Sequence, residues 1–238
     1  MAIAGLYKIF DRWHREGSVY ICSDPHFGDP DLAHLPGRPP ADELVRLINS
    51  KVGRKDTLII LGDIYDPSYV AKLRGYKVLI MGNHDSGRTN YERNYWIEWF
   101  DQDKYTREGA LAEMRTMYPN CHYTISGDFN HSWEIKADNM LFDEVYEGPL
   151  MIAEKLILSH EPVQVPWAHN LHGHNHVGTC KDKNHTNVCL DVTGYLPVNL
   201  NQWMKQGHFA HIPSIHRTTI DTATIRKAKR GGKKIGEK

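Results

Sequence analysis

The 238-residue chain is 40% hydrophobic and 24% charged, with 29 basic and 29 acidic side chains, as is ordinary for a soluble globular protein. Its four cysteines form no CxxC pair, which excludes a disulfide framework and favours reduced, mostly buried thiols. Apolar runs such as residues 57–61 are far shorter than the roughly 20 residues of a membrane span, and charged residues directly follow the apolar first ten, unlike a signal peptide. We therefore expect a cytoplasmic protein that makes no contact with a membrane.

The first part of the chain predicts strands that alternate with helices. Residues 18–23, 56–61 and 76–81 are short runs of apolar and β-branched residues, as expected of buried β-strands. Residues 41–52 carry apolar side chains at helical spacing, after a loop rich in Pro, Gly and Asp at residues 29–40. This alternation favours an α/β fold with parallel strand pairing.

Residues 86–150 break this alternation, and we interpret them as an inserted cap over the site. Residues 107–118 predict one helix within the insert. Four aromatic side chains near the start of the insert could stack on a nucleobase. Their spacing equally suits the buried face of a cap helix, and we favour this packing role. These are Tyr91, Tyr95, Trp96 and Trp99.

The last part of the chain predicts further strands and a basic tail. Residues 155–159, 187–193 and 207–212 read as strands. Residues 226–238 hold seven Lys or Arg and one Glu, which leaves the remaining chain with 22 basic against 28 acidic side chains. We expect a single domain at residues 1–225 followed by a disordered, solvated tail, with contact between the tail and nucleic acid as the less favoured alternative.

Polar side chains with metal-binding chemistry follow the predicted strands or lie in glycine-containing turns. They are Asp24, His26, Asp63, Asn83, His84, Asp85, His160, His174 and His176. Because the carboxyl ends of the strands in an open α/β sheet lie at one edge, residues far apart in sequence would converge there. Imidazoles, carboxylates and one amide, without a thiolate, suit a metal of intermediate softness. The pattern therefore predicts a metal site at this edge.

Five sequence blocks carry a resemblance to a known family. They are D-x-H at 24–26, G-D-x-x-D at 62–66, G-N-H-D at 82–85, the single His160, and G-H-x-H at 173–176. Together they resemble the signature of the calcineurin-like metallophosphoesterase superfamily. The Ser-His-Glu-Pro context of His160 is similar to that of small prokaryotic or phage-type members. The resemblance covers residues 18–85 and 150–200, and leaves the insert and the tail outside.

The resemblance implies an α/β fold in which two β-sheets pack as a sandwich flanked by helices. It also implies a hydrolase that cleaves phosphate esters with a hydroxide bound to a pair of divalent metal ions. One metal ion would be held by Asp24, His26 and His176, the other by Asn83, His160 and His174, and Asp63 would bridge the two. The donors suit Mn²⁺, which we favour, and also Fe, Zn or Ni.

The resemblance assigns further roles beside the metal ions. His84 would not be a ligand but would donate to the phosphate or protonate the leaving oxygen. Asp66 would hydrogen-bond His84 and favour its charged form, and Asp85 would have a structural role in the turn. Asn83 and Arg88 are the candidate substrate-binding residues, although a solvated position is favoured for Arg88. Two further histidines, His169 and His172, are expected to support the site or to lie at the surface.

The substrate is less well defined by the sequence than the chemistry. Ser/Thr protein phosphatases of the superfamily have Arg-Gly after the second block, whereas Pro67 and Ser68 follow Asp66 here. This favours a phosphodiesterase that acts on a nucleotide-type or cyclic phosphodiester or on a short oligonucleotide, with a phosphomonoesterase as the runner-up. A non-catalytic protein-binding scaffold and an RNA-binding protein that acts through the tail are the alternatives from other classes. The scaffold is disfavoured because His84 and all seven ligand positions are intact.

Overall fold

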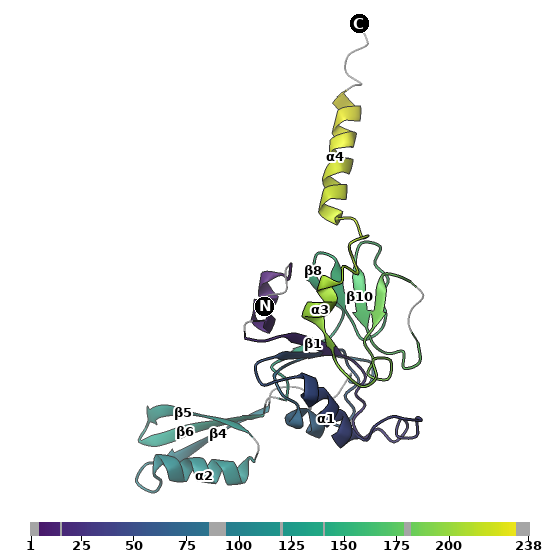
Figure 1. The fold of residues 1–238 in the computed structure, drawn as a ribbon. Coiled ribbons are helices and arrows are strands. Elements are labelled where there is room, and N and C mark those ends of the chain that lie inside the picture. The colour runs from purple at the N-terminus through teal and green to yellow at the C-terminus, as the bar shows by residue number, and fades with distance from the viewer. Residues whose placement is uncertain are drawn as a thin grey trace.

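The computed structural model describes residues 5–14, 16–85, 94–119, 121–139, 141–178 and 182–231. The elements, with η for a 3₁₀ helix, are η1 (Lys8–His14), β1 (Val19–Cys22), α1 (Ala41–Lys51), β2 (Thr57–Ile60), η2 (Pro67–Lys72), β3 (Tyr76–Ile80), β4 (Asn94–Asp101), α2 (Arg107–Met117), β5 (His122–Phe129), β6 (Ser132–Asn139), β7 (Glu144–Tyr146), β8 (Leu150–Ala153), β9 (Leu156–Leu158), β10 (His169–His172), β11 (His185–Asn187), β12 (Val198–Asn199), α3 (Leu200–Lys205) and α4 (Ile215–Gly231). They form a body with two sheets, an insert that projects from it, and a helix that extends from it (Figure 1).

The two sheets of the body are built mainly from parallel strands. The first has the order β12-β1-β2-β3-β7, in which β12 is antiparallel and the others are parallel. The second has the order β11-β10-β9-β8, in which β9, β10 and β11 are parallel and β8 is antiparallel. The predicted parallel pairing is therefore present. It brings the carboxyl ends of β1, β2 and β3 to one edge.

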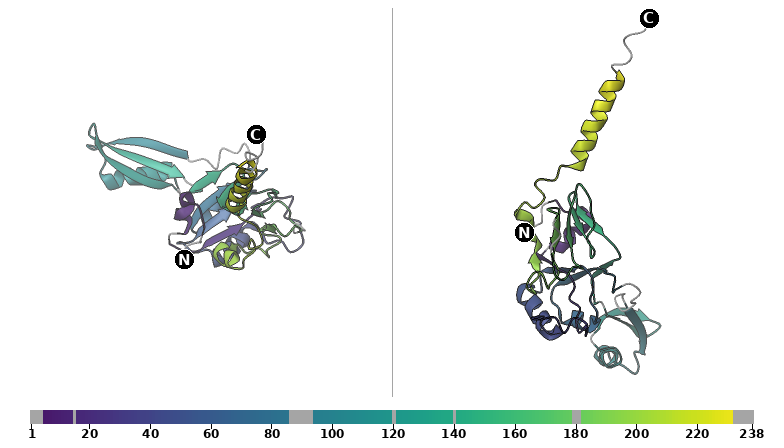
Figure 2. Two further views of the ribbon diagram at one scale, coloured as in Figure 1. Left: turned by 90° about the horizontal axis from the view of Figure 1, so that it is seen from above. Right: turned by 90° about the vertical axis from the view of Figure 1, so that its right-hand side faces the viewer.

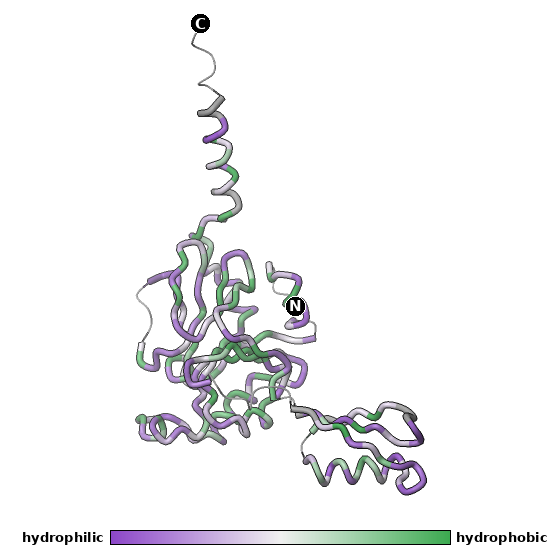
Figure 3. Tube along the Cα trace, turned by 180° about the vertical axis from the view of Figure 1, so that it is seen from behind, coloured by the Kyte–Doolittle hydropathy of each residue, from purple (hydrophilic) through white to green (hydrophobic). Residues whose placement is uncertain are grey.

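Both faces of the first sheet are covered, which explains why its strands are apolar throughout. Ile59 of β2 packs in a cluster with Leu158 and Leu171 of the second sheet. Its neighbour Ile60 points to the opposite face and packs in a cluster with Leu44 and other residues of α1. Figure 3 shows hydrophobic segments gathered in the central strands of the body. The expected fold, two β-sheets packed as a sandwich and flanked by helices, is confirmed.

The insert is a small α/β unit with its own core. Its antiparallel sheet has the order β4-β6-β5, and α2 packs against it through Ala110 and Met114. The helix expected at residues 107–118 is present as α2. The cap helix suggested for the preceding aromatic segment is wrong, because residues 94–101 form strand β4. Trp96 packs into the insert core whereas Trp99 is 49% exposed, which is the alternation of a strand.

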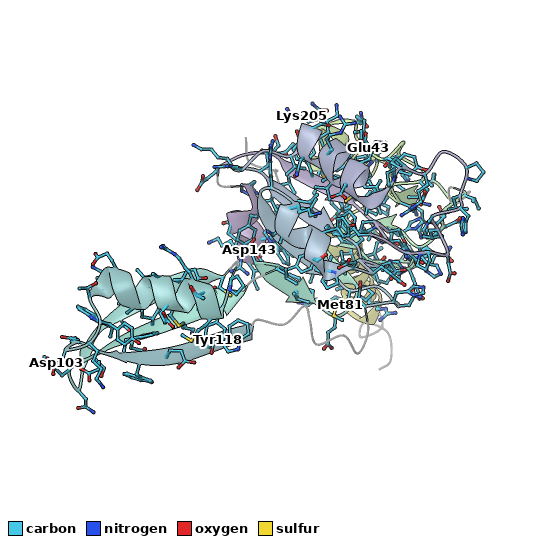
Figure 4. The ribbon with its side chains drawn as sticks, turned by 90° about the horizontal axis from the view of Figure 1, so that it is seen from below. Glu43, Met81, Asp103, Tyr118, Asp143 and Lys205 are labelled. Carbon is cyan, nitrogen blue, oxygen red and sulfur yellow. The ribbon has the colours of Figure 1, made fainter. Side chains whose placement is uncertain are left out.

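The insert projects from the body instead of forming the expected cap over the strand ends. Figure 1 and both views of Figure 2 show it extending to one side. In Figure 4, Met81 and Asp143 lie on the side of the body from which the insert projects, whereas Asp103 lies at its far end. The insert therefore joins the body beside the carboxyl end of β3.

The C-terminal part differs from the sequence-based expectation in two respects. Residues 207–212 form turns, not a strand, and a regular strand in the expected 187–193 segment is limited to the end of β11. Helix α4 extends away from the body and includes residues 226–231, which we expected to be disordered (Figure 1). The expected domain boundary at residue 225 thus falls within a helix. None of the helices in the described ranges is long and apolar enough to cross a membrane.

Candidate metal centre

The predicted metal-binding residues lie where the two sheets meet. Strand β1 runs into the second sheet through the turn that carries Asp24, since the N–H of Ser23 donates to the carbonyl of Val188 at 3.1 Å. On the second sheet, the N–H of Gly173 donates to the carbonyl of His160 at 2.8 Å. The N–H of Asp24 also donates to the carbonyl of Gly62 at 3.2 Å, and the N–H of Val188 donates to that of His172 at 2.7 Å. Backbone hydrogen bonds therefore join the turns after β1, β2, β9 and β10 at one rim.

The glycines of the sequence blocks allow these turns to approach closely. A Cβ atom added to Gly62 would lie 2.9 Å from His160 Nδ1, and one added to Gly82 would lie 2.8 Å from the same atom. A Cβ atom on Gly173 would overlap the side chains of Ser23 and Asp24. Each glycine thus leaves room for a side chain of another block, which explains its place beside a functional residue.

A first group of donors gathers around Asp24, which is fully buried. Its Oδ1 atom lies 3.7 Å from His176 Nε2 and 4.0 Å from His26 Nε2. Neither Asp24 Oδ1 nor His26 Nε2 has a hydrogen-bond partner. A buried polar atom without a partner is costly, and a bound cation would satisfy both of these atoms. We name Asp24, His26 and His176 the first cluster.

A second group of donors gathers around His160. Its Nε2 atom lies 2.9 Å from Asn83 Oδ1 and 3.1 Å from His174 Nδ1. The opposite ring nitrogen, Nδ1, lies 2.8 Å from the carbonyl of Leu61 and donates to it. In the neutral ring this bond leaves a lone pair on Nε2, which faces the amide oxygen of Asn83 and the Nδ1 atom of His174. We name Asn83, His160 and His174 the second cluster.

Asp63 lies between the two clusters. Its Oδ2 atom is 3.4 Å from His26 Nε2 and 3.3 Å from His160 Nε2. Burial alone would raise the pKa of Asp63, but its interactions with the nearby rings of His26 and His160 outweigh burial and lower the pKa below its ordinary value. An ionised carboxylate between two groups of imidazoles is suited to contact two cations.

These donors fit divalent metal ions. Asp24, His26 and Asp63 can hold one ion, and Asp63, His160 and His174 can hold another, because within each trio the ligand atoms lie within 4.8 Å of one another. The set combines imidazoles, carboxylates and an amide, as expected for Mn, Fe, Zn or Ni. The unpartnered atoms of Asp24 and His26 point to the same chemistry.

Comparison with known proteins agrees with this geometry. The model of the calcineurin-like phosphoesterase family matches residues 17–194, three quarters of the chain. The chain belongs to this family. A search of curated proteins found no match. Among solved structures, the chain is similar to AQ665 from Aquifex aeolicus, a protein of unknown function, with 20% identity and a TM-score of 0.47 over 79% of this chain and 98% of that one.

In this calcineurin-like phosphoesterase, His84 lies beside the clusters and remains accessible. Its backbone N–H donates to Asp63 Oδ1 at 3.0 Å, and its side chain is 54% exposed. The ring centroid lies 5.5 Å from that of His26. The Nε2 atom of His84 lies 4.0 Å from Asp63 Oδ2, and its role as a proton donor that is not a ligand stays a prediction.

The expected hydrogen bond between Asp66 and His84 is absent from the described structure. Asp66 Oδ1 instead accepts from the backbone N–H of Ser68 at 2.9 Å and caps η2. The reason is local, since Pro67 starts η2 and its first turn offers free N–H groups to a preceding Asp. The assignment of Asp66 as a hydrogen-bond partner of His84 is therefore wrong for this structure.

Other predicted residues fall into two groups. Arg88 lies outside the described residues, as does Tyr91. His169 and His172 are both buried, not at the surface. His169 packs against Trp203 in the core, with ring centroids 5.0 Å apart, whereas the Nδ1 atom of His172 contacts the carbonyl of Gly173 at 2.9 Å.

Three residues near the first cluster were not found from the sequence. Asp29 Oδ2 lies 2.9 Å from His26 Nδ1, and its position three residues after His26 could have indicated this pairing. Asp191 Oδ2 lies 2.7 Å from His176 Nδ1 and also accepts from Arg38. Burial alone would raise the pKa of Asp191, but hydrogen bonds from His176 and Arg38 outweigh it and lower the pKa to about 2. No sequence signal links Arg38 with Asp191, which lies 153 residues away.

Proposed function

We propose that this calcineurin-like phosphoesterase is a phosphodiesterase that uses two divalent metal ions, one at each cluster. The observation that carries the proposal is the position of Asp63, whose Oδ2 atom lies 3.4 Å from His26 Nε2 and 3.3 Å from His160 Nε2. A carboxylate placed between two donor clusters can serve two cations at once. Mn²⁺ is the favoured metal, with Fe, Zn or Ni as alternatives.

The side chains around the clusters have different roles in hydrolysis. Two divalent cations, when bound, polarise the phosphoryl oxygens and lower the pKa of a water that attacks phosphorus. Asn83, which is exposed, can contact the phosphate from the second cluster. His84 stands outside both clusters with half of its side chain accessible, so it can reach the ester and protonate the leaving oxygen.

A cavity beside the second cluster supports a diester as the substrate. It has a volume of about 260 Å³, and its lining includes His160, Asn83, Glu147 and Glu161. The described lining contains two carboxylates and no Lys or Arg. A phosphomonoester carries close to two negative charges at neutral pH and a diester carries one, so the carboxylates disfavour the monoester more strongly. A nucleotide-type or cyclic phosphodiester is the substrate class we favour.

An activity screen of the metal-loaded protein tests this proposal. The protein would be stripped with a chelator, reloaded with Mn²⁺ and assayed with bis(p-nitrophenyl) phosphate, p-nitrophenyl phosphate and a 2′,3′-cyclic nucleotide. We expect kcat/KM for the diesters to exceed that for the monoester by at least tenfold. A preference for the monoester would establish the runner-up, a phosphomonoesterase. Lack of turnover after reloading with Mn²⁺, Fe, Zn or Ni in turn would favour the non-catalytic scaffold.

The role of His84 is tested by His84→Ala. We expect turnover to fall by roughly 10²–10⁴-fold, because the leaving oxygen loses its proton donor, while the metal content stays at the wild-type value. His131→Ala is a matched control, because His131 is an exposed histidine on the insert, 3.2 Å from Asp103. A His84→Ala enzyme as fast as wild type would show that the acid is a different group.

The basic tail has a separate test. Deletion of residues 226–238 should leave hydrolysis of small substrates unchanged, because α4 extends away from the body (Figure 1). Loss of nucleic-acid affinity on this deletion would support the alternative role of the tail. The cytoplasmic location stays a prediction.

A further inference from the structure

A buried arginine from outside the five sequence blocks contacts the first cluster. Arg38 lies at the end of the loop before α1, and its side chain is 3% exposed. Its Nη2 atom donates to the carbonyl of Pro25 at 2.8 Å and to the carbonyl of Asp24 at 3.2 Å. The guanidinium thereby holds the backbone of the turn that carries Asp24 and His26.

The same guanidinium also contacts the carboxylate that holds His176. Arg38 Nη1 donates to Asp191 Oδ2, and His176 Nδ1 lies 2.7 Å from this same oxygen. Because an ionised carboxylate only accepts, His176 must carry its hydrogen on Nδ1. In the neutral ring, Nε2 then carries the lone pair, and this atom faces Asp24 Oδ1 at a distance of 3.7 Å.

The contacts of Arg38 distinguish a role at the site from simple anchoring of a loop. Both carbonyls that it binds belong to the D-x-H block, and its carboxylate partner is bound to a third candidate ligand. A planar guanidinium presents several donors in a fixed fork, which suits it to make these contacts at once. The pair of Arg38 and Asp191 is itself buried, with side chains that are 3% and 7% exposed.

We propose that Arg38 and Asp191 are positioning residues for the first metal ion. They fix the Asp24–His26 turn and the His176 ring relative to each other, so that the donors of the first cluster face one point. The inference rests on the proposed dinuclear centre. It adds two residues that lie outside the family blocks, and it predicts that their loss affects the first metal site more than the second.

Metal titration of the chelator-treated protein tests the inference without an activity assay. Calorimetry with Mn²⁺ would compare wild type with Arg38→Gln, Arg38→Lys and Asp191→Asn. We expect Arg38→Gln and Asp191→Asn to weaken binding at the first site by about 10–100-fold, because the supporting hydrogen bonds are lost, and to leave the second site nearly unchanged. Arg38→Lys should recover part of the affinity, since it keeps the charge but not the fork.

Arg46→Gln is the matched control, because Arg46 makes a similar pair with Glu43 on the exposed side of α1. It should leave both metal affinities at the wild-type values. Wild-type binding at both sites in Arg38→Gln and Asp191→Asn would overturn the inference, as would an equal loss at both sites in Asp191→Asn. Failure of wild type itself to bind two ions would instead contradict the proposed function.

The tautomer of His176 gives a readout in the metal-free protein. Long-range proton–nitrogen NMR at pH 8 should find wild-type His176 protonated on Nδ1. In Asp191→Ala the carboxylate acceptor is absent, and we expect the hydrogen to shift toward Nε2. An unchanged tautomer in Asp191→Ala would show that Asp191 does not orient the ring. Because this measurement needs no metal, it separates failure of the positioning role from failure of the dinuclear centre.

Discussion

Asp85 accepts a hydrogen bond from the backbone N–H of Asp63 at 2.7 Å, so the third sequence block holds the turn of the second. The same carboxylate accepts from the N–H of Ile64 at 3.1 Å and from the N–H of Gly82 at 2.9 Å. Asp85 is fully buried. Its role is therefore structural, as expected, and consists of aligning the strand ends of β2 and β3.

Asp85→Ala should lower the free energy of unfolding by on the order of 3 kcal/mol, because three buried N–H groups lose their acceptor. Chemical denaturation of the metal-free proteins would measure the difference. Asp103→Ala is the control, since this carboxylate is 81% exposed on the insert, and we expect a change below about 0.5 kcal/mol. Equal stabilities of the two variants would contradict the structural role of Asp85.

Asp63→Asn should remove metal from the protein. The amide keeps the size of the side chain and tolerates its left-handed backbone, with φ 58°, but it lacks the negative charge that two cations would share. We expect elemental analysis after dialysis to find at least one metal ion fewer per chain than in wild type. A variant that still holds two ions would show that Asp63 does not bridge them.

Asp66→Ala should affect stability and not the acid limb of the pH–rate profile. Its carboxylate caps η2 through the N–H of Ser68, so its removal should cost about 1 kcal/mol in the free energy of unfolding. The profile should stay in place because no hydrogen bond joins Asp66 to His84 in the described structure. A shift of the acid limb by half a pH unit would instead restore the pairing implied by the family signature.

His169 should make the protein sensitive to acid. Burial, with smaller contributions from the charges of His208 and other histidines, lowers the pKa of His169 from 6.5 to about 4. The unfolded chain therefore takes up a proton first as the pH falls. The associated stability is complete above pH 6.5 and is lost between pH 6.5 and 4, by about 3 kcal/mol in total.

Stability against urea between pH 7 and 4 would check the effect in metal-free protein, where release of metal cannot contribute. His169→Gln keeps a group that can bind Thr186 but does not titrate. We expect this variant to lose less stability than wild type over the same pH range. Parallel losses in the two proteins would assign the acid sensitivity to other groups.

Regular patterns in the sequence predicted much of the fold, and short or mixed patterns did not. The strand at residues 76–81 was predicted from a short, almost continuous apolar run, and the helix at residues 41–52 from apolar residues at helical spacing. Residues 207–212 contain three aromatic or apolar positions among His and Gly, which is too short a pattern to exclude a turn. In residues 94–101, Trp96 and Phe100 also lie four apart, so a helix and a strand could both bury them.

The sequence predicted those residues of the site whose type and motif indicate metal binding. His26 and Asp63 stand in short motifs at strand ends, where the topology alone brings them together. Arg38 and Asp191 belong to no such motif, because their role depends on a contact between a loop and the end of the second sheet. Asp66 shows the opposite case, in which a motif residue serves a nearby helix terminus.

Several of the candidate ligands, Asp24, His26, Asp63 and His174, have positive φ angles of 38° to 66°. This region of backbone conformation costs residues other than glycine on the order of 1 kcal/mol each, so glycine would relax every one of these turns while deleting a donor. At these positions, a substitution that raises thermal stability consequently removes a side chain that the chemistry needs. A directed-evolution experiment that selected for heat resistance alone would replace the residues of this rim first.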